Sequence, residues 1–133
     1  MSLNSTLRGF VVATAIILTG LCTACRDIQD SDLVGRFEFE HGSVRIELQL
    51  HSDHSYVETI AQNGTNTASN STWEYHERPP HLTLKDFSGP VVSLGSETVH
   101  LDQSLFVLSV EPCGKTICLI ASDDDPVLRF VKN

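Results

Sequence analysis

Four cysteines and six histidines are the residues with the most distinctive chemistry in this 133-residue sequence. Cys22 and Cys25 follow an apolar stretch near the N-terminus, whereas Cys113 and Cys118 lie near the C-terminus in the run C-G-K-T-I-C. A thiol can be modified, oxidised to a disulfide or used as a metal ligand, depending on the compartment and on its neighbours. The surroundings of each pair therefore decide which chemistry we expect.

Residues 1–24 have the features of a secretory signal. Arg8 is their only charged residue, residues 10–21 form a mainly apolar run, and the small residues Thr23 and Ala24 follow. A positive start, a short apolar segment and a small-residue cleavage site are typical of such signals. The apolar run is too short to cross a bilayer, which takes about 17 to 25 residues, so we expect a cleaved signal helix.

The end of this signal resembles the lipobox of bacterial lipoproteins, in which a Leu-like residue and two small residues precede a cysteine. Here L-C-T-A-C ends at Cys25, with Cys22 where Leu is usual. The resemblance implies that Cys25 is acylated, anchors the chain to the membrane and becomes its first mature residue. Arg26 in second place favours the outer membrane facing the periplasm. The alternative is cleavage after Ala24 and a soluble secreted protein.

Processing and acylation leave Cys113 and Cys118 as the remaining thiols. Exported proteins lie where disulfides persist. Gly114 and Lys115 predict a turn, which would bring the two Cα atoms within the required separation of about 4.4–6.8 Å. We therefore predict a disulfide; the alternative is two free thiols, with Cys118 packed as a small apolar residue.

His51 and His54, with Asp53 between them, are the candidates for a zinc or copper site. A third ligand, such as His76 or His81, would have to come from another strand. Histidines exposed in turns and at strand ends are the favoured interpretation, so no metal or other cofactor is predicted.

No motif for catalysis or phosphate binding is present. The sequence lacks G-x-S-x-G, S-x-x-K, a P-loop and G-x-G-x-x-G, so no catalytic residue is named and a non-enzymatic role is expected. The formal net charge of −8 repels phosphates, which argues against nucleic-acid binding.

Apolar and polar residues alternate with a period of two from residue 35 onward, as in half-buried strands. The expected strands cover residues 36–40, 44–50, 56–61, 73–75, 82–84, 105–110, 117–121 and 127–131. Residues 41–42, 51–54 and 123–126 are expected as turns, residues 63–72 as a solvated loop, and residues 87–98 as a long loop or an irregular edge.

Neighbouring strands joined by short turns pair antiparallel. We therefore predict an all-β fold, an antiparallel meander of about seven to eight strands forming a small barrel, half-barrel or sandwich after the signal helix. Residues 1–24 are interpreted as the lipoprotein signal peptide, residues 25–34 as a tether and residues 35–133 as a single β domain.

The order G-R-F, L-Q-L-H-S-D-H-S-Y, T-W-E and L-T-L over residues 35–84 resembles small bacterial lipoproteins with a lipocalin-like β-meander. Those proteins read G-x-Y, L-x-L-x-x-D-G-x-Y, G-x-W and L-x-L. This chain departs at His54 and Thr72, where glycine is usual, and at Phe37, where tyrosine is usual. The resemblance implies a fold and an envelope location, and it supplies no catalytic residue.

Three functions remain to be separated. The first is an envelope lipoprotein whose β domain is a non-enzymatic binding or structural module for a protein partner or cell-wall component. The second is a lipocalin-like carrier, which needs an apolar cavity of about 300 Å³ or more, whereas a packed interior favours the first. The third is a hydrolase, which needs clustered Ser, His and Asp in a cleft.

Overall fold

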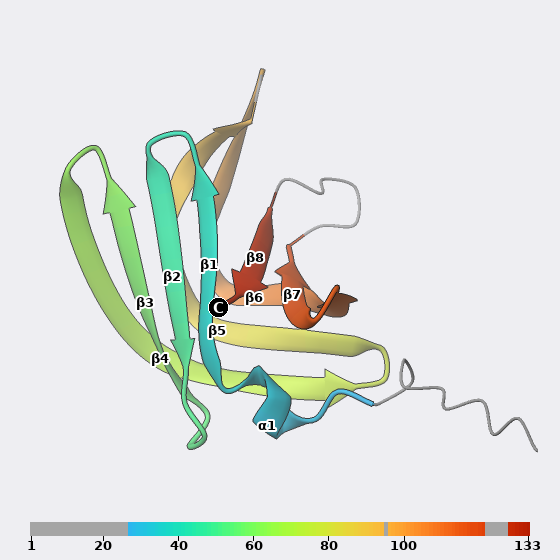
Figure 1. Ribbon diagram of the computed structural model, residues 1–133. Helices are drawn as coiled ribbons and strands as arrows, with labels where there is room; N and C mark the ends of the chain where they lie inside the picture. The colour runs from blue at the N-terminus through green and yellow to red at the C-terminus, as the bar shows by residue number, and fades with distance from the viewer. Residues whose placement is uncertain (1–26, 95, 122–127) are drawn as a thin grey trace, which may run out of the picture.

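The computed structural model describes residues 27–94, 96–121 and 128–133, which form one short helix and eight strands (Figure 1). The elements are α1 (Asp30–Leu33), β1 (Gly35–His41), β2 (Val44–Leu50), β3 (Ser55–Gln62), β4 (Thr65–Glu77), β5 (Pro80–Leu94), β6 (Glu97–Cys113), β7 (Thr116–Ile120) and β8 (Arg129–Lys132). Each strand pairs antiparallel with the next, and β8 pairs with β1, so the sheet closes into a barrel. The predicted antiparallel all-β fold is confirmed; the signal helix and the turn at residues 123–126 lie outside the described residues.

The alternation along the strands places one set of side chains inside the barrel. On β2, Ile46 and Leu48 are fully buried, and they alternate with partly exposed polar residues. The largest fully buried side chains are Tyr56, Phe37, Phe87, Phe130, Leu33, Ile46, Leu48, Leu50, Leu82, Leu84, Leu101 and Leu108. Burying one such apolar side chain stabilises the fold by about 1.5–3 kcal/mol, so these residues account for much of its stability.

The expectation of a loop over residues 63–72 is wrong. Only Asn63 and Gly64 form a turn, with φ angles of 50° and 77°, and residues 65–72 are the first half of β4, paired with β3. Positive φ at both central residues identifies the two-residue hairpin turn that favours Asn-Gly. The polar composition hid the strand because this part of β4 lies at an exposed edge and buries little.

Residues 87–98, expected as a long loop or an irregular edge, are mostly strand. They belong to the end of β5 and the start of β6, whose pairing continues to Leu94 and Glu97. The irregularity is a shift of register between Ser88 and Val91. A Cβ atom on Gly89 would lie 2.3 Å from the Leu101 Cβ atom, so the backbone approaches its neighbours too closely here for any side chain.

β4 and β5 pair along only part of their lengths. Their ladder runs from Glu77 and Pro80 to Trp73 and Leu84 and ends there. Beyond it, residues 65–72 of β4 pair only with β3, and the outer part of β5 pairs only with β6. Figure 1 shows the first half of β4 and the tip of the β5–β6 hairpin rising separately. We call residues 65–72 of β4 and 85–94 of β5 the two arms of a fork.

Residues 27–33, which the sequence presents as part of a tether, contact the barrel. They include α1, and Leu33 at its end is fully buried in the core. Within the described part of the chain, no helix has the length and apolar character needed to span a membrane.

Candidate functional site

The barrel interior is packed with side chains. Phe87 and Phe106 stack with ring centroids 4.5 Å apart, and Phe39 and Phe130 pack at 5.4 Å. Trp73 is a core residue with 3% exposure. Large side chains therefore occupy the space that a lipocalin-like carrier would use for an apolar ligand.

Residues 28–33, which we call the leading segment, precede β1 and are held against one end of the barrel. Helix α1 is short and begins with a capping contact, in which the Gln29 backbone N–H donates to the Asp32 carboxylate at 3.0 Å. The Tyr75 hydroxyl donates to the Ile28 carbonyl oxygen at 3.1 Å, and the Lys132 ammonium group donates to the Asp32 carbonyl oxygen. Together with buried Leu33, these contacts fix the path of the chain from residue 28 into β1.

The turn between β2 and β3 also contacts the leading segment. The His54 Nε2 atom lies 2.9 Å from the Asp30 carboxylate, and the His54 ring packs on Trp73 with centroids 4.5 Å apart. The Trp73 indole N–H donates to the His51 carbonyl oxygen at 3.1 Å. This turn is therefore joined both to the leading segment and to the core.

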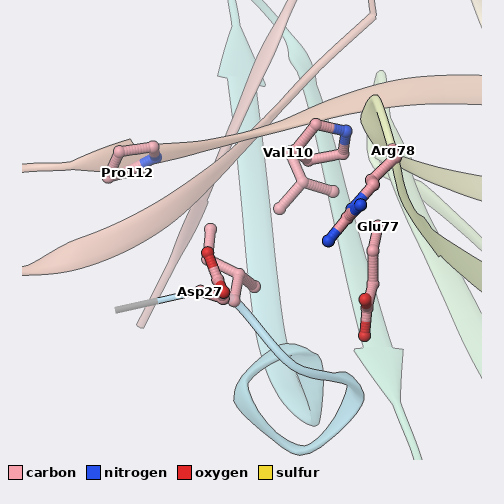
Figure 2. Close-up of a pocket in the computed structure, with 7 residues that line it drawn as sticks. Asp27, Glu77, Arg78, Val110 and Pro112 are labelled. Atoms are coloured by element: carbon pink, nitrogen blue, oxygen red, sulfur yellow. The ribbon is translucent and has the colours of Figure 1, made fainter. Parts of the chain in front are cut away.

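A pocket of about 250 Å³ opens beside the leading segment (Figure 2). It is lined by Asp27, Ile28, Glu77, Arg78, Pro80, Val110 and Pro112. Glu77 ends β4, Arg78 follows it in the turn, and Val110 lies on β6, so the pocket lies between these strands and the residues that follow the predicted anchor. Its lining combines three charged residues, Asp27, Glu77 and Arg78, with apolar ones.

The structure places the predicted metal candidates in the β2–β3 turn, both exposed. The His54 ring contacts the Asp30 carboxylate, and the His54 backbone N–H donates to the His51 carbonyl oxygen at 3.1 Å. Within residues 27–94, 96–121 and 128–133, no three His, Cys, Asp or Glu side chains gather in a way that could hold a metal ion. The stacked pair of His76 and His81, with centroids 4.5 Å apart, lies on the β4–β5 hairpin, away from that turn.

The predicted disulfide between Cys113 and Cys118 is confirmed. Their Cα atoms are 5.5 Å apart, and the bond closes the β6–β7 turn at Gly114 and Lys115. Cys22 and Cys25 lie outside the described residues. The lipid anchor therefore stays a prediction.

Sequence analysis missed one buried acid, Glu58. It lies on β3 between the inward-facing residues Tyr56 and Ile60 and is 1% exposed. The Ser69 hydroxyl donates to Oε1 at 3.0 Å, whereas Oε2 has no hydrogen-bond partner among the described residues. Burial raises the pKa of Glu58, the nearby Asp102 charge adds to this, and the Ser69 hydroxyl and the Ser88 backbone N–H act in the opposite direction.

The signal for Glu58 was its position in the alternation. In Y-V-E-T-I the acid has the same parity as Tyr56 and Ile60, which places it inside the barrel if the strand is regular. A buried carboxyl group that lacks one partner is costly, so its position requires a structural or functional reason. Glu58 lies between the two arms of the fork, because Ser69 on β4 donates to it and the backbone N–H of Ser88 on β5 lowers its pKa.

Comparison of the chain with family models, with curated proteins and with solved structures finds no match in any of the three.

Proposed function

We propose that this protein is a lipid-anchored module of a bacterial cell envelope, and that its barrel binds a partner without catalysing a reaction. The anchor is an acylated Cys25, and the proposed location is the outer membrane, facing the periplasm. No nucleic acid is involved. The lipobox-like run supports the anchor, and the antiparallel barrel is compatible with a binding module.

The observation that carries the proposal is the attachment of residues 28–33 to the barrel. Arg26 and Asp27 alone separate this segment from Cys25. An acyl group on Cys25 would therefore hold the α1 end of the barrel close to the headgroups, with little free tether between them. The pocket beside Asp27 would then face the membrane surface, and the opposite end of the barrel, with the β5–β6 tip, would project from it.

The carrier function receives less support than the binding module. A carrier needs an enclosed apolar cavity, and Phe87, Phe106 and Phe130 pack inside this barrel. A hydrolase also receives less support, since His54 contacts Asp30 and Trp73 and no serine hydroxyl donates to it among the contacts of the described residues.

Metabolic labelling with an alkyne fatty acid tests the anchor in cells that express the full chain. Wild type should carry the label and sediment with membranes, whereas Cys25→Ala should be unlabelled. Cys22→Leu is the matched control, because it removes the neighbouring thiol, restores the residue that is usual at that position and keeps the proposed acylation site. Label that persists in Cys25→Ala, or its absence from wild type, contradicts the proposal.

A further inference from the structure

The first arm of the fork has a row of backbone groups that no described strand pairs. In an antiparallel strand, successive residues direct their N–H and C=O groups to opposite sides. The Trp73 N–H donates toward β3, to His54 at 2.8 Å, and the two-residue turn sets the same parity from Thr65 onward. Asn66, Ala68 and Asn70 therefore direct their N–H and C=O groups away from β3, toward the open side.

This edge lacks the usual protection against pairing. Residues 65–72 read T-N-T-A-S-N-S-T and contain no charge and no proline. Exposed edges are commonly protected by charges, prolines, bulges or covering segments. By contrast, the outer face of β1 and β2 carries ion pairs such as Arg45 with Glu38 at 2.7 Å. The first half of β4 is thus a regular strand that is open to another strand.

The second arm of the fork is closed. The Lys85 carbonyl oxygen accepts a hydrogen bond from the Tyr56 hydroxyl at 2.5 Å. The Ser88 backbone N–H lowers the pKa of Glu58. Pro90 has no N–H, and the register shifts between Ser88 and Val91. An added strand would therefore pair with β4 and not with β5.

The charges around the fork favour one class of partner. Asp86 and Asp102 are exposed on the β5–β6 side, and both act electrostatically on groups at the fork, Asp86 on Tyr56 and Asp102 on Glu58. Lys85 is the cation on that arm, and the whole chain has a net charge of −8. A second copy of this chain would be repelled, whereas a basic segment would be attracted.

We propose that an extended basic segment of a partner protein adds to β4 as a further strand. Its main chain pairs with Asn66, Ala68 and Asn70, and its Lys or Arg side chains face the carboxylates of the β5–β6 arm. Main-chain pairing supplies affinity and the side chains supply selectivity, as in other cases of strand addition. The proposal names a partner for the binding role above, but it does not depend on acylation of Cys25, so the two can fail separately.

Binding of short peptides to the purified full-length protein in detergent tests the proposal. The probe is a fluorescein-labelled peptide of alternating Thr and Lys; one control replaces Lys by Glu, and another is N-methylated at alternate residues so that one edge cannot donate. Fluorescence anisotropy should show saturable binding of the Lys peptide, about tenfold or more tighter than either control.

A pair of variants locates the binding on β4. Ala68→Pro removes an N–H on the open side without removing a bond to β3, and should weaken binding about tenfold. Ala68→Thr keeps the N–H and should change the Kd less than about twofold. Circular dichroism checks the fold; if Ala68→Pro does not fold, the N-methylated peptide decides.

Three results would overturn the proposal. One is no binding of the Lys peptide, and another is equal binding of the Glu or N-methylated peptide. The third is a dimer, detected by light scattering, that Ala68→Pro separates, since the occupant of the edge would then be a second copy.

Discussion

The two arms of the fork differ in what their backbone groups contact beyond the end of the β4–β5 ladder. Both lose their neighbouring strand beyond Trp73 and Leu84. On β5, the Lys85 carbonyl oxygen accepts the Tyr56 hydroxyl, the Ser88 backbone N–H lowers the pKa of Glu58, and the strand is interrupted by a bulge. On β4, the corresponding groups stay open along a regular, uncharged strand.

The difference leaves β4 as the arm that can accept a further strand. Backbone groups left unpaired on an edge invite pairing with another chain, and proteins generally block them. In this chain the β5 arm is blocked, and Glu58 beside it is a buried acid whose Oε2 atom has no hydrogen-bond partner among the described residues.

Gly89→Ala should have the largest effect. The new Cβ atom would lie 2.3 Å from the Leu101 Cβ atom and 2.7 Å from its backbone carbon, so rigid neighbours would have to move. We expect a loss of about 3 kcal/mol in the free energy of unfolding, measured by urea denaturation. Gly42→Ala is the control, because it has positive φ but open space around it, and should cost only about 1 kcal/mol. Equal losses would contradict the close packing at the bulge.

Glu58→Gln should change how stability depends on pH. Burial raises the pKa of Glu58 above its ordinary value of 4.5, so folding favours the protonated form. Below pH 4.5 the carboxyl group is protonated in both states and costs nothing extra. As the pH rises through the folded-state pKa, the wild-type free energy of unfolding should fall by about 1–3 kcal/mol relative to the variant.

Urea denaturation of both proteins between about pH 4 and pH 8 measures this difference. Other carboxyl groups contribute equally to both proteins, so the difference isolates Glu58. Parallel pH curves would mean that Glu58 is not held in a desolvated position between the arms.

Tyr56→Phe should destabilise the protein by about 1 kcal/mol, because the Lys85 carbonyl oxygen loses its donor. Tyr75→Phe is a matched control that removes a similar hydroxyl, the one that donates to Ile28 at the leading segment. Amide hydrogen exchange should accelerate on the outer part of β5 in Tyr56→Phe and not in Tyr75→Phe. The same response in both would show that Tyr56 has no special role in closing the β5 arm.

Ala68→Val should have the smallest effect. The side chain is exposed on the regular, open arm, so we expect a change within about 0.5 kcal/mol in the free energy of unfolding. Differential scanning calorimetry would detect a larger change. A loss comparable with that of Gly89→Ala would mean that the edge of β4 is packed against other residues.

Alternation predicted the fold because most strands have one buried face, as on β2. It failed on residues 65–72, where the strand buries almost nothing and composition resembles a loop. It also failed at Ser88, Gly89 and Pro90, whose turn-like sequence forms a bulge inside a long hairpin. The disulfide was predictable because its two cysteines flank a short turn.

The fork itself was beyond prediction from sequence. It depends on where β4 stops pairing with β5, which is set by the curvature of the whole barrel and not by any local pattern. The same is true of the attachment of Ile28 and Asp30, whose partners, Tyr75 and His54, lie far away in the sequence. Of these features, only the burial of Glu58 could be predicted from the sequence, because the acid occupies an inward-facing position in the alternation of β3.

Amide hydrogen exchange by NMR tests the contrast between the arms most directly. Asn66, Ala68 and Asn70 should exchange at nearly unprotected rates, whereas Thr67 and Ser69, which pair with β3, should be protected about 100-fold or more. Ser88 should be protected by Glu58. Protection of the first three amides, together with fast exchange at Ser88, would contradict the account, because β4 would then be the closed arm and β5 the open one.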